Sequence, residues 1–402
     1  MPRFIYTAKS DPTKTIQGEI EAESQVDAIN KLHKMGYFPI TVRVEDLSPE
    51  KQGILRLRKV ANRDIVLFTR QLSTLVESGV NILAGLNIVT KQIPNKYLKA
   101  VLNDVTGKIK DGKSFSDSLR FHPDLFPGLY TSIVHSGEVG GNIEQALKRL
   151  ADFLENEEEF KNSIRAALTY PLFILSVSIL TVIVLLGFVI PRLVGMFQDM
   201  GQILPLPTKI LINISAFLRT YWWFILAVIL IFVFLLRRMH RNSRGKIAID
   251  GFRLKLPVMG EIILKSEIGR LARTLSLLIS SGMPIVYSLD ISASVLENEI
   301  LKLEIAKFKN EIAGGASFSK CLINSKLFPI FVTNIVAVGE ETGTLEKSLL
   351  RIADDYEREV DRTLKSLTRL LEPVIILVMG LIVGFIVLSM LLPIFQINLI
   401  VK

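Results

Sequence analysis

The sequence predicts a mainly α-helical, polytopic membrane protein with two duplicated cytoplasmic six-helix bundle domains, three transmembrane helices and a small N-terminal ββαβ module. Three observations predict this class. The 402 residues are 49% hydrophobic although 22% are charged, so apolar residues must be concentrated in particular segments. Uncharged apolar runs of membrane-spanning length are present. A pattern of about 105 residues occurs twice along the chain.

The first 45 residues are predicted to form the ββαβ module. Phe4–Ala8 and Ile16–Ala22 have the alternation and residue types of strands. Ser24, with Asp27 three residues later, is a typical start of a helix, and this helix ends near Gly36. Phe38–Val44 then reads as a third strand. A polar linker follows at 46–60.

The repeat relates residues 61–170 to residues 265–372. Thr69–Val80 aligns with Ala272–Met283 at an offset of 203 residues. After the loss of one residue the offset becomes 202, and Gly137-Glu138 matches Gly339-Glu340 while Pro171 matches Pro373. The period is much longer than that of a solenoid, so a whole domain has been duplicated.

Each copy has helical periodicity throughout. In the first copy, a helix from Asn62 ends at Gly79, the next ends before Pro94, and a third covers 96–110. Ser114 or Ser116 is placed to cap a short helix that stops at Pro123, and another helix covers 128–135. A long last helix begins near Asn142 and runs towards the membrane, which gives six helices.

Three apolar segments are predicted to span a membrane. Leu172–Ile190 and Pro373–Phe395 carry no charge and have the required length of about 20 residues. Tyr221–Leu236 is shorter and reaches this length only if it extends back past Arg219. We therefore place spans at 171–190, 217–236 and 373–395. Three buried core helices are the alternative, but uncharged runs this long are uncommon in soluble cores.

The basic residues predict the orientation. The net charge is +9, and five basic residues follow the second span directly: Arg237, Arg238, Arg241, Arg244 and Lys246. Because cytoplasmic loops are enriched in such residues, the N-terminus and the basic juxtamembrane linker at 237–264 are expected in the cytoplasm. The loop at 191–216 and the tail at 396–402 are then periplasmic. Nucleic acid is an alternative partner for this charge, but its juxtamembrane place favours lipid headgroups.

No set of residues predicts catalysis. Gly107–Ser114 fits the phosphate-loop pattern, but such a loop needs a strand before it, and here the preceding residues have helical spacing. The four histidines are scattered, and the single cysteine, Cys321, has no suitable partner. No span has an Asp, Glu, Lys or Arg in its interior, which disfavours a transporter. We expect no enzyme activity, no cofactor and no metal.

The most distinctive polar feature is a repeated Gly-Glu-x-x-Gly turn, formed by Gly137, Glu138, Gly141 and by Gly339, Glu340, Gly343. The glycines allow positive φ between two helices, and the glutamate is expected to face the N-terminus of the following long helix. The alternative is a contact surface for a partner or for another copy of the chain. In the third span, Gly380 and Gly384 form a G-x-x-x-G pair for helix packing, either within the chain or between subunits.

These motifs together resemble the type II secretion system F family. The resemblance rests on Ser136-Gly137-Glu138, Leu147, Leu150-Ala151 and Tyr170-Pro171 before a span, and on Phe4-x-Tyr6-x-Ala8 and Gly18-x-Ile20-x-Ala22 near the N-terminus. It covers essentially the whole chain. The second copy departs from the pattern, since Val338 stands in place of Ser136 and Glu372 in place of Tyr170.

The resemblance implies a multi-pass platform protein of the bacterial inner membrane. Members of the family couple a cytoplasmic hexameric secretion ATPase to the insertion of pilin-like subunits, without catalysis of their own. Type II secretion is the main expectation, and the equivalent role in type IV pilus assembly is the alternative. The implied partners are the ATPase, other inner-membrane components, pilin-like subunits, membrane lipids and further copies of the chain. Nucleic acid is not among them.

Overall fold

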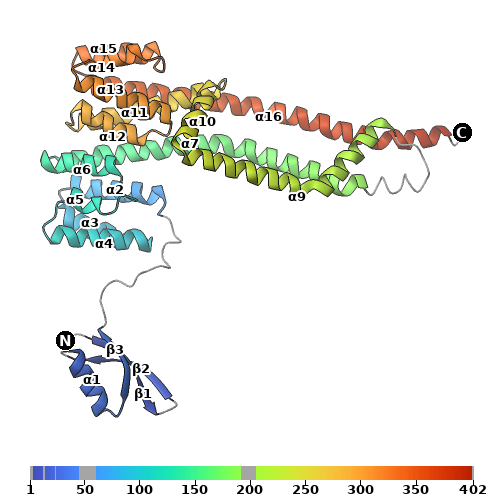
Figure 1. Ribbon diagram of the computed structural model, residues 1–402. Helices are drawn as coiled ribbons and strands as arrows, with labels where there is room; N and C mark the ends of the chain where they lie inside the picture. Colours follow the sequence, from blue (N-terminus) through green and yellow to red (C-terminus); the bar gives the residue numbers. More distant parts are fainter. Residues whose placement is uncertain (1–2, 12–13, 23, 45–59, 192–204, 401–402) are drawn as a thin grey trace. The chain divides into compact units, whose positions relative to one another are not determined.

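The structure, a computed structural model, describes residues 3–11, 14–22, 24–44, 60–191 and 205–400. Helices account for most of these residues (Figure 1). The chain divides into two compact units, Met1–Val60 and Ala61–Lys402. The second unit holds both copies of the repeat and the long apolar helices.

The N-terminal unit contains a three-stranded antiparallel sheet and one helix. The strands are β1 (Arg3–Asp11), β2 (Lys14–Glu21) and β3 (Phe38–Val44), in the order β2-β1-β3. Helix α1 (Gln25–Lys34) begins at Ser24, whose hydroxyl accepts a hydrogen bond from the backbone N–H of Asp27 at 3.2 Å. Ala22, Ala28 and Leu32 form the small buried core.

The first copy contains six helices. They are α2 (Asn62–Glu77), α3 (Ile82–Gln92), α4 (Lys96–Lys110), α5 (Phe115–Arg120), α6 (Gly128–Val139) and α7 (Ile143–Val184). Polar residues cap several helix starts: Asn81 accepts from Ala84 N–H, and Ser114 accepts from Asp117 N–H. The apolar faces of these helices meet in a buried core that includes Phe68, Leu72, Leu86, Leu102, Tyr130 and Leu147.

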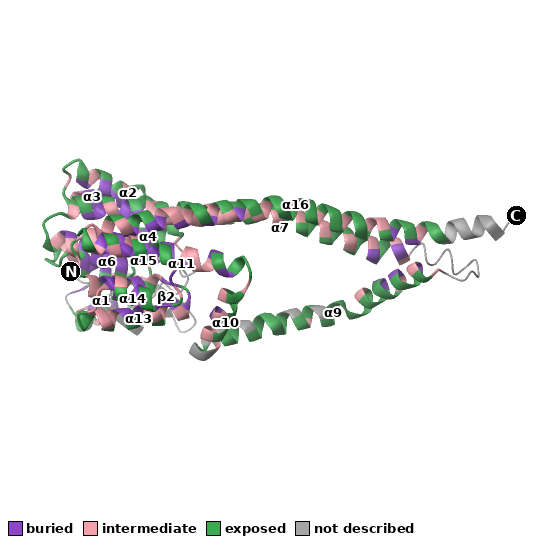
Figure 2. Ribbon diagram, turned by 90° about the horizontal axis from the view of Figure 1, so that it is seen from above, coloured by how far each residue is buried: buried purple, intermediate pink, exposed green. Residues whose placement is uncertain are grey.

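The second copy repeats this arrangement. Its helices are α11 (Met259–Ser280), α12 (Ile285–Val295), α13 (Glu299–Ala313), α14 (Phe318–Asn324), α15 (Ile330–Glu341) and α16 (Leu345–Ile400). Its core is one continuous cluster that includes Leu275, Ile305, Phe308, Phe318, Val336 and Ile352. Figure 2 shows buried residues gathered in the two copies, whereas the helices that extend from them are largely exposed.

Two of the described helices are long and apolar enough to cross a membrane. They lie in 143–189, which joins α7 to a π-helix, η2 (Leu185–Val189), and in 345–392 of α16. A third stretch, α9 (Leu206–Arg241), meets the same test only if its two halves, which are bent by 43°, are taken as one span. Helix α10 (Ser243–Lys255) connects α9 to the second copy.

Helices α7 and α16 run side by side where they leave the two copies (Figures 1 and 2). Val360 and Leu364 of α16 pack there with Ile262 of α11 and with Phe160 and Ile164 of α7. The hydroxyl of Tyr170 donates a hydrogen bond to Glu372 Oε1 at 2.9 Å. These residues occupy equivalent positions of the two copies, so the departure of Glu372 from the family pattern creates a polar contact between the copies.

Candidate functional site

The Gly-Glu-x-x-Gly turns connect α6 to α7 and α15 to α16, and the two glycines of each turn have different roles. Gly141 and Gly343 have φ of +67° and +70°, the left-handed region that glycine enters freely. Gly137 lies within α6 and is required by packing, because a Cβ there would lie 2.4 Å from Ala146 Cβ. A Cβ at Gly339 would lie 2.4 Å from Ser348 Oγ. The expectation of positive φ therefore holds for the second glycine of each turn, whereas the first permits close helix contact.

The glutamate of each turn binds the start of the short helix before it. Glu138 accepts hydrogen bonds from the N–H groups of Phe115 (2.6 Å) and Ser116 (2.9 Å), at the beginning of α5. The expectation that Glu138 faces the N-terminus of the following long helix is wrong. The N–H groups at the start of α5 lack partners within that helix, and the carboxylate reaches them because α6 folds back beside α5.

Glu340 makes the equivalent contacts in the second copy. Its carboxylate accepts from the N–H groups of Phe318 (2.8 Å) and Ser319 (3.0 Å) and from the Ser319 hydroxyl (2.6 Å). Partial burial raises the pKa of Glu340, but these hydrogen bonds outweigh burial and hold the pKa below its usual value. The two turns are thus built alike and fix the short helix, the turn and the long helix to one another.

A second repeated cluster was missed in the sequence. Arg70 of α2 donates to Asp152 and Glu155 of α7, and the bond from its Nε to Glu155 Oε1 is 2.7 Å long. Arg273 of α11 donates in the same way to Asp354 and Glu357 of α16. Hydrogen bonding to Arg70 lowers the pKa of Glu155. The sequence repeat contains this cluster, because the arginine recurs at an offset of 203 residues and the two acidic residues recur at an offset of 202.

Replacing Arg273 with methionine is expected to destabilise the second copy by about 2 kcal/mol, because two carboxylates lose a charged partner. The rate at which thiol reagents label Cys321 measures how often the second copy opens. Its side chain is 1% exposed, and burial raises the pKa of the thiol to about 11, so thiol reagents label it only when the second copy opens. We expect faster labelling of the full chain in detergent. Arg70→Met, the same change in the first copy, should alter the rate far less, and equal effects would contradict the prediction.

The phosphate-loop pattern does not form a phosphate site. Gly107 lies in the last turns of α4, so a helix stands where the motif needs a strand. Lys108 of this segment pairs with Asp104, and Lys113 lies over the ring of Phe121, with 4.2 Å from Nζ to the ring centroid. Among the described residues, no group of three or more His, Cys, Asp or Glu side chains is arranged to hold a metal ion.

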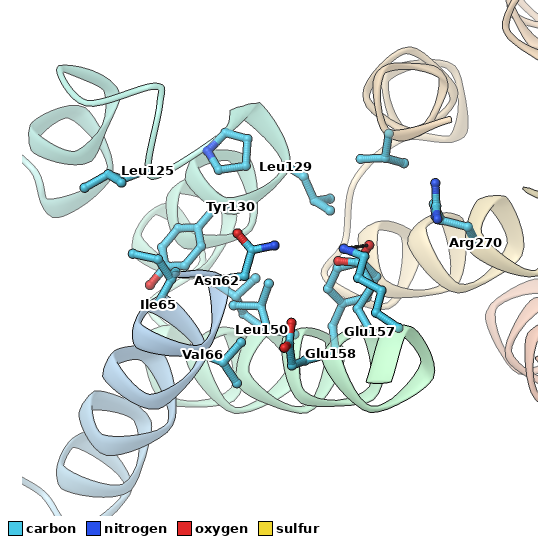
Figure 3. A pocket seen from close by; sticks show the side chains of 15 residues that line it. Asn62, Ile65, Val66, Leu125, Leu129, Tyr130, Leu150, Glu157, Glu158 and Arg270 are labelled. Carbon is cyan, nitrogen blue, oxygen red and sulfur yellow. Dashed lines mark ion pairs between the residues drawn. The ribbon is translucent and has the colours of Figure 1, made fainter. Parts of the chain in front are cut away.

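The two copies meet along a groove that the sequence did not predict. The Ser136 hydroxyl on α6 donates to the carbonyl of Ser281 at 2.6 Å, and Arg149 on α7 donates to the carbonyl of Ser280. A neighbouring cavity of about 180 Å³ is lined by residues of both copies. Figure 3 shows Tyr130 and Leu129 of the first copy on one side of it and Arg270 of the second copy on the other. Glu157, Glu158 and Lys161 of α7 also line this cavity.

The remaining predicted residues lie on or beside the apolar helices. Arg237 and Arg238 are exposed in the last turns of α9, whereas Lys246 on α10 lies 2.9 Å from Glu299, and this contact raises the pKa of Lys246. The side chains of Arg241 and Arg244 lie outside the described part of the structure.

Gly380 and Gly384 make no close contact with the described residues of the other helices. A Cβ added at either glycine would meet no other described atom within 4 Å. The long helices also pack together beyond these glycines, nearer the C-terminus of α16, where Leu186, Leu211 and Ile386 meet. The alternative, a contact of these glycines with another subunit, stays a prediction.

Comparison with known proteins adds independent information. A family model described as type II secretion system, protein F, matches residues 68–191 and 271–393, and the model of its N-terminal domain matches residues 1–43. The type IV pilus assembly protein PilC of Myxococcus xanthus is 35% identical over 98% of this chain and 94% of its own length. PilC of Thermus thermophilus is 35% identical over 99% of this chain and 98% of its own. The type II secretion system protein F of Vibrio cholerae is 31% identical over 99% of both chains.

Proposed function

Because the chain belongs to the type II secretion system protein F family, we propose that it is an inner-membrane platform protein that scaffolds the assembly of pilin-like subunits. The observation that carries this proposal is the match of the family model to both copies, each of which ends in a helix that continues into an apolar stretch. In this role the chain couples a cytoplasmic hexameric ATPase to the insertion of pilin-like subunits and catalyses nothing itself.

Two machines use such a platform. Type II secretion is the function we propose first, with assembly of a pseudopilus for protein export. Type IV pilus assembly is the alternative, because proteins of both machines are similar to this chain over nearly its whole length. Other inner-membrane components and membrane lipids complete the proposed partners.

The proposed topology has three spans. We infer that α9 crosses the membrane as a bent span, together with the apolar parts of α7 and α16. The basic residues Arg237 and Arg238, directly after the apolar part of α9, support a cytoplasmic N-terminus and a periplasmic C-terminus. The proposed domain limits are those of the sequence: spans at 171–190, 217–236 and 373–395, with cytoplasmic bundles at 61–170 and 265–372.

Deletion of the gene tests the function. We expect the deletion strain to lose either an exported protein from the culture medium or pili from the cell surface, and the full chain supplied in trans to restore it. Loss of the secreted protein alone identifies type II secretion, and loss of pili alone identifies pilus assembly. If both export and pili persisted in the deletion strain, the platform role would be wrong.

A further inference from the structure

Besides the packing of α7 on α16, the two copies meet through a second contact, and this second contact is one-sided. The first copy contributes α6 and α7 through Ser136, Arg149 and Phe153, and Phe153 is only 6% exposed. The second copy contributes the C-terminal end of α11, through the carbonyls of Ser280 and Ser281. At this second contact, different faces of the duplicated fold meet, as in a heterologous rather than a two-fold interface.

Because the fold is duplicated, each copy also carries the face that the other one uses. On the second copy the equivalents of Leu129, Ser136 and Arg149 are Phe331, Val338 and Arg351, which we call the α15–α16 surface. On the first copy the equivalents of Arg270, Ser280 and Ser281 are Leu67, Glu77 and Ser78, which we call the α2 surface.

Both surfaces carry apolar side chains that are exposed to solvent. Val338 is 59% exposed and Phe331 46%, although Leu129, the equivalent of Phe331, is only 6% exposed. Leu67 on the α2 surface is 49% exposed. These are apolar side chains on two faces whose equivalents are in contact within the chain.

The charges on the two surfaces are also complementary. Arg149 meets the backbone carbonyl of Ser280. The equivalent of Ser280 is Glu77, so Arg351 would approach a residue that offers a carboxylate in addition to its backbone carbonyl. Glu77 already pairs with Lys148 through Oε1, yet both side chains are about half exposed. An ion pair this exposed contributes little and leaves the second carboxylate oxygen available.

We propose that the α15–α16 surface of one chain docks on the α2 surface of a second copy of the same chain. The contact between chains then repeats the contact within each chain, with Arg351 against Glu77 and Val338 against Ser78. Such a head-to-tail contact continues from chain to chain, and it closes into a ring where the rotation permits. The proposal goes beyond the platform function, because it assigns the self-association surface.

Cross-linking of the full chain in membranes tests the contact. Two differently tagged chains, one with Val338→Cys and the other with Ser78→Cys, are expressed together in a Cys321→Ala background and treated with a short bis-maleimide. We expect a cross-link between the two tags. A chain carrying both Ser136→Cys and Ser281→Cys calibrates the reagent, since these side-chain and main-chain positions already touch. Lys99→Cys, exposed on α4, replaces Ser78→Cys as the matched control and should give no product.

The outcomes separate the possible interfaces. A cross-link between two Val338→Cys chains, with none in the mixture, would show a two-fold interface and overturn the proposal. No product in either sample would overturn it as well. The deletion experiment tests the platform function, and the cross-linking experiment tests only the contact between chains. The absence of a cross-link would therefore not contradict the platform function.

Charge exchange provides a second measurement. Arg351→Glu and Glu77→Arg are each expected to reduce the cross-link about tenfold, and the two changes together in one chain should restore it, because the opposite charges then meet again. Lys320→Glu makes the same change of charge on α14 of the second copy, away from both surfaces, and should have no effect. An equal loss with Lys320→Glu, or no recovery in the double variant, would contradict the pairing.

Discussion

Replacing Gly339 with valine is expected to destabilise the second copy by about 3 kcal/mol, which raises the population of opened molecules roughly 100-fold. A Cβ at this position would lie 2.4 Å from Ser348 Oγ, 2.7 Å from Ser348 Cβ and 3.2 Å from Leu345 Cα. The last of these atoms is backbone, so the side chain fits only if the start of α16 moves away from α15. Labelling of Cys321 in the full chain should accelerate accordingly.

Two further variants identify close packing as the cause. Gly269→Ala is the matched control, because its Cβ would meet its nearest neighbour, Tyr356 Cβ, at an ordinary 3.6 Å. It should label like the unaltered chain. Gly339→Ala should be partly rescued by Ser348→Gly, which removes the two side-chain atoms in the way. A Gly339→Val chain whose Cys321 labels at the unaltered rate would show that α15 and α16 do not pack this closely.

Replacing Glu340 with alanine is expected to cost about 3 kcal/mol. The change removes one partner from the N–H groups of Phe318 and Ser319 and from the Ser319 hydroxyl, and hydrogen bonds to a charged group contribute about 1.5–3 kcal/mol each when they are intact. Because these bonds hold α14, which carries Cys321, thiol labelling reports their loss directly. Glu138→Ala removes the same carboxylate from the first copy and should change the labelling of Cys321 much less.

The carboxylate of Glu340 is also expected to make the stability of the second copy decrease at acidic pH. The pKa of Glu340 is lower in the folded chain than its ordinary value of 4.5. Its ionised form therefore stabilises the fold fully above that ordinary value, and this contribution is lost as the pH falls through the lowered pKa. Glu340→Gln should be less stable at neutral pH and should lose less stability on acidification. A parallel pH dependence in both proteins would show that Glu340 is not the titrating group.

The helices were predictable because their signals are local. The sequence placed a helix from Asn62 to Gly79 and another over 96–110, and the structure has α2 at Asn62–Glu77 and α4 at Lys96–Lys110. Apolar spacing, serine caps and glycine ends all act within a few residues. The same reasoning placed Gly141 and Gly343 at turns, where both have positive φ.

The contacts between helices were not predictable in this way. Glu138 reaches back 23 residues to Phe115, and nothing in the turn itself indicates that direction. The first glycine of each turn was assigned to backbone freedom because sequence spacing cannot show how closely two helices approach. The Arg70 and Arg273 clusters could have been found, since a basic residue and two acidic residues recur together in both copies.

The continuity of α16 has a mechanical consequence. This helix begins two residues after the Gly343 turn and continues without a break to Ile400. At 1.5 Å per residue its 56 residues measure roughly 84 Å. A hydrogen-bonded helix resists twisting and bending, so a tilt or rotation of Leu345 is carried along α16 as far as Pro373, where the hydrogen-bond ladder lacks one N–H. The Gly-Glu-x-x-Gly turn joins α15 to the first residues of α16, so a movement of the bundle would enter the long helix through this turn.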